Sequence, residues 1–297
     1  MTAESKKQAR TGVGLFLLLV FASSVFVGMD GERLRSIAGS HAISLYMWWV
    51  AASSMIARLL LREPFRDGSF RWERWATTRA MLVAALMPML IGGISYGLAW
   101  TTGLARFSPA LVGGSLFGFN LTGSGGAAFW KYLLVSWIPG GLWACKAAAG
   151  EEIGWRGYML TRLIRSGVPG PVFVSGLVWA LWHLPLILGG QYGLVDAAPE
   201  AIAVFTVNIV GLGYILAWLR LSSGSIWPCI LAHGMWNALI AGAFHDCTRG
   251  GTEWVGESGV LTAIIVVLGA AGLNLLWPVR QGGGQPVIKE DHFSHAS

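Results

Sequence analysis

Long apolar runs, separated by short polar loops, occupy most of this 297-residue chain and constrain its fold more than any other feature. A helix rises 1.5 Å per residue, so about twenty apolar residues suffice to cross the hydrocarbon core of a bilayer. Hydrophobic residues make up 54% of the chain and charged residues only 12%, against about 25% charged residues in soluble domains. The sequence therefore predicts an all-α polytopic transmembrane helix bundle.

The apolar runs predict about eight spans, and no polar block between them is long enough to fold separately. We therefore expect one integral-membrane domain over 1–280, with its motif core at about 142–240, followed by a disordered cytoplasmic tail at 281–297. The expected spans lie at about 12–30, 42–61, 80–103, 142–165, 171–188, 201–219, after Ser225, and at about 258–279.

Lysine and arginine gather in every second connection, which indicates the orientation of the spans. By the positive-inside rule, both termini are expected in the cytoplasm. The style of the composition favours a bacterial cytoplasmic membrane as the location, with the lipid bilayer as a partner. The net charge of +6 is spread over short loops, which argues against nucleic-acid binding. The basic groups stand at the amino terminus, at 58–79, at 162–165, around Arg220 and in the tail.

The segment 127–141 is an apolar run that Pro139-Gly140-Gly141 interrupts after little more than ten residues. Such a run is too short to cross the membrane alone. Three interpretations therefore remain for this segment: a span, a re-entrant segment and an interfacial segment. We expect the next helix to begin after this interruption, at about residue 142.

Two adjacent carboxylates, Glu151 and Glu152, and an arginine, Arg156, stand inside one of the expected spans. A charged group near the bilayer centre costs roughly 2.5–3.5 kcal/mol, which makes a functional site the default interpretation. On a helix, Glu152 and Arg156 share one face and can pair, while Glu151 points about 100° away. Glu151 is therefore the carboxylate that we expect to be free for chemistry.

Two further polar pairs with the same spacing lie on later spans: Trp179 with His183, and His233 with Asn237. From the rise per residue, both histidines, Asn237 and Glu151 can reach one level in the membrane. A carboxylate, two imidazoles and an amide on separate helices suit hydrolysis by an activated water. Glu151 would take a proton from the water with help from His183, while His233 and Asn237 would donate to the oxyanion.

The three motifs resemble those of the CPBP or Abi family of intramembrane proteases, which includes Rce1-like CAAX prenyl endopeptidases. The resemblance covers about 150–240 and departs from the family pattern at Trp179, where phenylalanine is more usual. It implies peptide-bond cleavage in a membrane cavity that opens towards the cytosol, with Glu151 and His183 activating the water and His233 and Asn237 forming the oxyanion site. The matching motifs are Glu151-Glu152-x-x-x-Arg156, Trp179-x-x-x-His183 and His233-x-x-x-Asn237.

Two alternatives stay open beside this glutamate-peptidase hypothesis. In a zinc-dependent intramembrane protease, Glu151, His183 and His233 would be ligands of Zn2+, although no H-E-x-x-H motif is present. In a membrane transporter or a non-catalytic peptide-binding immunity protein, the same site would bind a peptide or an ion. Our main expectation is no cofactor and no metal, with a peptide or protein substrate. A lipidated or membrane-embedded substrate stays open as one form of it.

Overall fold

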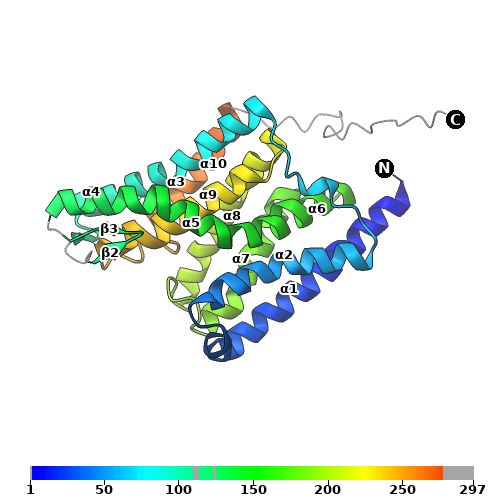
Figure 1. Cartoon of the computed structure of the whole chain (residues 1–297), viewed down its shortest axis with the longest axis horizontal. Coiled ribbons are helices and arrows are strands. Elements are labelled where there is room, and N and C mark those ends of the chain that lie inside the picture. Colours follow the sequence, from blue (N-terminus) through cyan, green and yellow to red (C-terminus); the bar gives the residue numbers. More distant parts are fainter. Residues whose placement is uncertain (1, 110–113, 123–124, 277–297) are drawn as a thin grey trace.

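Continuous helical segments form nearly all of the structure, a computed structural model that describes residues 2–109, 114–122 and 125–276 (Figure 1). Eight such segments run through the described residues, which confirms the all-α bundle expected from the apolar runs. The expected tail at 281–297 lies outside the described residues. The helices without a π turn are α1 (Ala3–Ala38), α2 (Ala42–Leu60), α3 (Arg74–Thr102), α7 (Pro171–Leu188), α8 (Pro199–Ser223) and α10 (Val260–Leu276). Helix α1 is kinked at Asp30, whose backbone is not helical.

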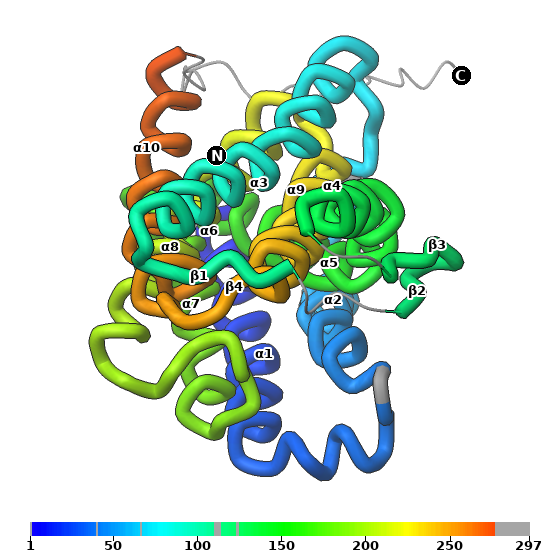
Figure 2. The backbone as a smooth tube through the Cα atoms, turned by 90° about the vertical axis from the view of Figure 1, so that its left-hand side faces the viewer, coloured from blue at the N-terminus to red at the C-terminus, as the bar shows by residue number. Residues whose placement is uncertain are grey.

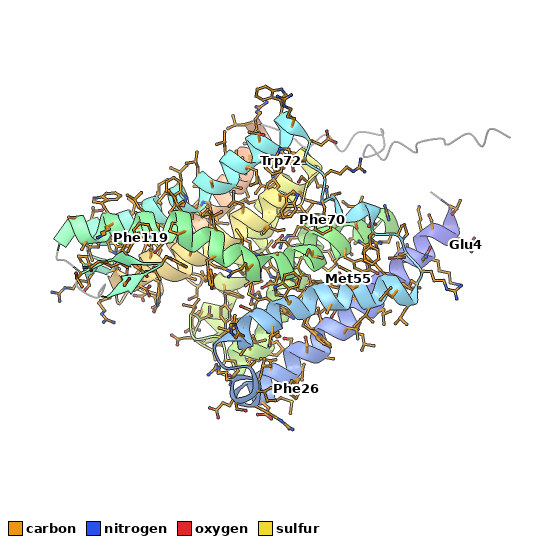
Figure 3. All side chains as sticks on the ribbon, in the orientation of Figure 1. Glu4, Phe26, Met55, Phe70, Trp72 and Phe119 are labelled. Atoms are coloured by element: carbon orange, nitrogen blue, oxygen red, sulfur yellow. The ribbon has the colours of Figure 1, made fainter. Side chains whose placement is uncertain are left out.

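Five of these helices, α1, α2, α3, α7 and α8, are long and apolar enough to cross a membrane. Large apolar side chains on their outer surfaces remain exposed, among them Phe26 of α1 and Met55 of α2 (Figure 3). A soluble protein rarely exposes so much contiguous apolar surface, whereas lipid covers it without penalty. The chain is thus a multi-pass integral membrane protein.

Two segments contain π-helical turns, and one of them corrects an expectation from the sequence. The backbone stays helical from 125 to 166, through Pro139-Gly140-Gly141, so the helix break expected before residue 142 is wrong. Proline lacks an N–H and clashes with the preceding turn, and a wider π turn accommodates both defects without ending the helix. This segment comprises α4 (Gly125–Val135), η4 (Ser136–Gly140), α5 (Gly141–Gly154), η5 (Trp155–Met159) and α6 (Leu160–Ser166), and the second comprises α9 (Trp227–Ala238) and η6 (Leu239–Phe244).

The remaining elements are short and lie in the connections. The strand pair β1–β4 joins the connection after α3 to the connection after α9, because Arg106 pairs with Arg249 and Phe107 with Thr248. These elements are the turns η1 (Gly39–His41) and η2 (Arg66–Gly68), and the strands β1 (Arg106–Phe107), β2 (Ser115–Leu116), β3 (Phe119–Asn120) and β4 (Thr248–Arg249).

Helix α5 lies in the middle of the bundle, packed between α2 and α9. In Figure 2, α1 and α2 occupy the lower side, α3 and α10 the upper side, and α5, α8 and α9 the space between them. Glycines permit the close approach: a Cβ on Gly150 would lie 2.7 Å from the Cα of Trp48, and one on Gly234 would lie 2.8 Å from the backbone nitrogen of Cys145. Residues of α5 and α9 that the sequence separates by about eighty positions therefore come into contact.

Candidate active site

Glu151 is a buried carboxylate near the end of α5, with 3% of its surface exposed. Its Oε2 accepts hydrogen bonds from the indole nitrogens of Trp155, at 3.1 Å, and Trp179, at 2.7 Å. Both donors are neutral, and no described lysine or arginine forms an ion pair with Glu151. The second carboxylate oxygen is left without a hydrogen bond from the described residues, as expected for the free member of the glutamate pair.

Glu152 has the partners that Glu151 lacks. Its Oε1 lies 2.8 Å from Nη1 of Arg156, which confirms the ion pair predicted from the spacing. The same oxygen lies 2.8 Å from Nδ1 of His233, which links α5 to α9. The guanidinium of Arg156 also stacks on Trp179, 4.2 Å from the ring centroid. Adjacent glutamates thus face different surroundings, because successive side chains of a helix diverge by about 100°.

A π-helical turn, η5, begins directly after the glutamate pair. The backbone N–H of Trp155, the first residue of this turn, donates to the carbonyl oxygens of both Glu151 and Glu152. Single π turns inside α-helices occur frequently at functional sites. The regular helix expected over 142–165 is therefore interrupted at the site itself.

His183 lies on α7 with its ring enclosed by Trp182 and Phe205. Its Nδ1 is 2.9 Å from the carbonyl oxygen of Trp179, one turn earlier. A carbonyl oxygen can only accept, so we assign the proton of the neutral imidazole to Nδ1. Nε2 then carries a lone pair and can accept a proton or a hydrogen bond.

His233 and Asn237 lie one turn apart on α9, as their spacing predicted. The contact with Glu152 occupies Nδ1 of His233 and leaves its Nε2 for a ligand. The amide of Asn237 is partly exposed and makes no hydrogen bond within the part of the chain that the structure describes. Both side chains line the same cavity as Glu151.

That cavity has a volume of about 330 Å3 and a mostly apolar wall with a few polar groups, as is typical of a binding site. The four residues predicted to be catalytic all line it, and so does Trp179. The supporting residues Glu152 and Arg156 lie behind the wall. The structure therefore brings together, from α5, α7 and α9, the side chains that the sequence analysis selected.

Glu257 is a second carboxylate of the cavity wall, and the sequence analysis did not select it. It is 4% exposed, and it accepts hydrogen bonds from Trp236 Nε1 at 2.8 Å and from the hydroxyl of Tyr192. Its backbone carbonyl also accepts from Asn208 Nδ2 at 3.0 Å. Glu257 stands in a polar loop outside any repeated spacing, so only the folding of this loop into the bundle reveals its position.

The proposed zinc ligands Glu151, His183 and His233 line one cavity but do not form a ligand set. No three histidine, cysteine, aspartate or glutamate side chains of the described residues lie close enough together to hold a metal ion. Oε2 of Glu151 is engaged by two indoles, and Nδ1 of His233 by Glu152. The arrangement does not fit a catalytic zinc, which takes three converging protein ligands.

Comparison with known proteins agrees with the three motifs. Residues 127–239 match the family model of the type II CAAX prenyl endopeptidases, Rce1-like. A CAAX prenyl protease 2 from Methanococcus maripaludis is 32% identical to this chain over 130 residues. The aligned part is 42% of this chain and 46% of that protein, so the match spans less than half of the relative's length. The family match includes all seven residues that the motifs supplied, and the predicted resemblance is confirmed.

Proposed function

We propose that this chain, whose residues 127–239 form an Rce1-like domain, is an intramembrane endopeptidase that cleaves peptide bonds with a water molecule activated by Glu151. The observation that carries the proposal is the Glu151 carboxylate, which faces the cavity beside two histidines and has no cationic partner among the described residues. A carboxylate held only by neutral donors keeps its ability to accept a proton, as a general base requires.

Water activation uses Glu151 and His183. The free oxygen of Glu151 takes one proton from the water, while Nε2 of His183 accepts a hydrogen bond that orients it. The hydroxide adds to the carbonyl carbon of the substrate, and the carbonyl π electrons move to its oxygen. Two indole donors hold Glu151, and the carbonyl of Trp179 holds His183, so neither base needs to reorient.

The oxyanion of the tetrahedral intermediate faces His233 and Asn237. The unengaged amide of Asn237 donates one hydrogen bond, and Nε2 of a protonated His233 donates another. Glu152 stabilises this imidazolium through Nδ1, and Arg156 positions Glu152. These two residues act through His233 and do not themselves reach the substrate.

Collapse of the intermediate completes the hydrolysis. The C–N bond breaks as Glu151 returns its proton to the leaving nitrogen. The carboxylic acid that forms then gives up the second proton of the water to the amine, so a carboxylate and an ammonium group remain. We propose that no metal or other cofactor takes part. The substrate is a peptide or a protein segment that enters the cavity within a bacterial cytoplasmic membrane.

The test compares purified wild type, Glu151→Gln and Glu200→Gln in detergent. Glu200 is exposed in the first turn of α8 and lies outside the cavity wall, so its variant is a matched carboxylate control. Cleavage of a peptide library and of quenched prenylated CAAX reporters is followed by mass spectrometry. We expect wild type and Glu200→Gln to cleave, with and without a chelator, and Glu151→Gln to fail at an unchanged melting temperature.

Three outcomes would contradict the proposal. Equal cleavage by wild type and Glu151→Gln would remove Glu151 from the mechanism. Loss of activity with a chelator and recovery with Zn2+ would restore the metalloprotease alternative. Peptide flux across vesicles without any cleavage product would favour a transporter.

A further inference from the structure

The cavity opens towards one end of the helix bundle. Its wall includes Gly31 and Arg35 near the end of α1, Ala42 at the start of α2, and residues 191–194 of the α7–α8 connection. The α1–α2 turn and the α7–α8 connection lie together at the lower left of Figure 1. We call this end of the bundle the mouth end.

The other end carries the start of α1 and the connections 61–73, 167–170 and 224–226, because successive helices run in alternating directions. In Figure 1 the amino terminus and α6 lie together at the right. None of these connections, all of which are described, contributes a residue to the cavity wall. We call it the arginine end.

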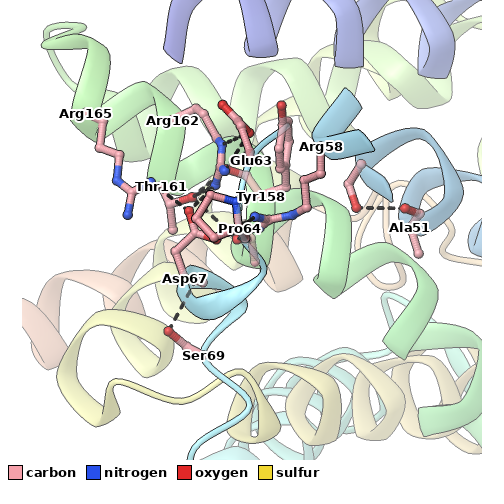
Figure 4. A network of polar contacts seen from close by, with 12 residues as sticks. Ala51, Arg58, Glu63, Pro64, Asp67, Ser69, Tyr158, Thr161, Arg162 and Arg165 are labelled. Atoms are coloured by element: carbon pink, nitrogen blue, oxygen red, sulfur yellow. Dashed lines mark hydrogen bonds and ion pairs between the residues drawn. The ribbon is translucent and has the colours of Figure 1, made fainter. Parts of the chain in front are cut away.

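A network of ion pairs, buried except at the partly exposed Arg165, closes the arginine end (Figure 4). Asp67 lies 2.6 Å from Arg58 of α2 and 2.7 Å from Arg165 of α6, and it also pairs with Arg162. Arg162 in turn lies 2.7 Å from Glu63. The network joins α2, the connection 61–73 and α6, so the helices are tied together where a second entrance would have to lie.

The two ends differ strongly in charge. The arginine end has twelve lysines and arginines against four acidic residues, and the mouth end has five against seven. Loops rich in lysine and arginine stay on the cytoplasmic side during membrane insertion. The counts cover 2–10, 58–79, 162–170 and 220–226 at the arginine end, and 30–42, 102–109, 114–122, 125–131, 188–200 and 244–260 at the mouth end.

We infer that the arginine end faces the cytoplasm and that the cavity opens to the extracytoplasmic side of the membrane. This orientation is opposite to the cytosolic opening that the family resemblance implies. A consequence for the substrate rests on the proposed peptidase function. With this orientation, the substrates are peptide segments that are exported or exposed in the outer leaflet. A CAAX tail in the cytosol would not reach the cavity.

Cysteine labelling in spheroplasts of a bacterial host tests the orientation without requiring activity. Ala197→Cys at the mouth end and Ala3→Cys at the arginine end replace exposed alanines and form a matched pair, and Ser36→Cys and Ala76→Cys repeat the comparison. The unmodified chain gives the background from the native cysteines, of which Cys229 and Cys247 are fully buried and Cys145 is partly exposed. A membrane-impermeant maleimide is applied before and after permeabilisation.

We expect Ala197→Cys and Ser36→Cys to be labelled in intact spheroplasts, and Ala3→Cys and Ala76→Cys only after permeabilisation. The reverse pattern, or labelling of both ends in intact cells, would overturn the inference. In a second arm, a library of impermeant peptides is added outside intact spheroplasts. If the labels show the expected orientation and no peptide is cleaved, the proposed function fails while the orientation stands.

Discussion

Two clusters of buried charges lie in the same bundle and are built in opposite ways. At the arginine end, Asp67 faces three arginines and Glu63 faces one, so both carboxylates have cationic partners. In the cavity, Glu151 is held by two neutral indoles, although its neighbour Glu152 has both Arg156 and His233. The difference lies in the completeness of charge pairing, because Asp67, Arg58 and Arg162 are buried, as Glu151 and Glu152 are.

This contrast suggests how to separate structural from chemical charges in a membrane protein. A fully paired buried cluster loses several kcal/mol when one partner is removed, so it holds helices in place. A buried carboxylate that no cation contacts directly is costly to keep ionised, and a proton or a ligand relieves this cost. We therefore assign anchoring to the first cluster and proton transfer to Glu151.

The largest effect is expected for Glu151→Gln. The amide cannot accept the proton of the water, so kcat/KM should fall roughly 10²–10⁴-fold. The Gln oxygen can still accept from both indoles, and the melting temperature should therefore remain close to that of wild type. Steady-state kinetics and thermal unfolding in detergent measure both quantities, and an unchanged kcat/KM would contradict the contrast between the clusters.

Asp67→Asn should produce the opposite result. Removing the carboxylate leaves Arg58, Arg162 and Arg165 crowded without their shared partner, which should destabilise the fold by about 3–5 kcal/mol. The activity of each folded molecule should stay near the wild-type level. Asp196→Asn, on an exposed loop, is the control for charge removal. A stable but inactive Asp67→Asn protein would show that the arginine cluster takes part in the chemistry.

Gly234→Ala should disturb the cavity cluster alone, by steric pressure between α5 and α9. The new Cβ would lie within 2.9 Å of Cys145 and of the carbonyl oxygen of Gly141, so α9 must move away from α5. Overpacking of this kind costs about 1–3 kcal/mol, and the Glu152–His233 contact should lengthen with a loss of activity. Gly97→Ala, which meets nothing within 4 Å, should be tolerated. Equal melting temperatures and rates for the two variants would argue against the close α5–α9 packing.

Glu257→Gln tests whether every buried carboxylate without a cationic partner is catalytic. Glu257 also accepts only from neutral donors, but the tyrosine and the tryptophan engage both of its oxygens. Loss of one such hydrogen bond should cost about 1 kcal/mol of stability, and kcat/KM should fall much less than in Glu151→Gln. A loss as large as that of Glu151→Gln would place a second proton-transfer group in the cavity.

The smallest effect is a pH dependence at the arginine end. Burial by itself would raise the pKa of Asp67, but Arg162 and Arg58 outweigh it and hold the pKa below the ordinary 3.8. The ionised carboxylate therefore stabilises the fold above pH 3.8, and this stability is lost as the pH falls through the lower folded pKa. The melting temperature of wild type should drop in this acid range more steeply than that of Asp67→Asn. If the melting temperatures of wild type and Asp67→Asn fell in parallel with pH, the stabilising role of the ionised Asp67 would be contradicted.

Features that depend only on residues close together in the sequence could be predicted from the sequence alone. The apolar runs predicted the helical segments, because crossing a bilayer requires length and apolarity, which are properties of a single segment. The spacing of Glu152 and Arg156 predicted their ion pair, because residues four apart meet on any α-helix. The three motifs together also indicated the family and the set of residues that line the cavity.

Only the tertiary structure decided which helices meet and how. The contacts of Glu152 with His233 and of Trp179 with Glu151 join helices far apart in the chain, and no local spacing encodes them. The π turns at 136–140 and 155–159 and the position of Glu257 were missed for the same reason. Helix periodicity is set by the nearest few residues, whereas these features depend on packing distances between segments, which glycines such as Gly150 and Gly234 permit.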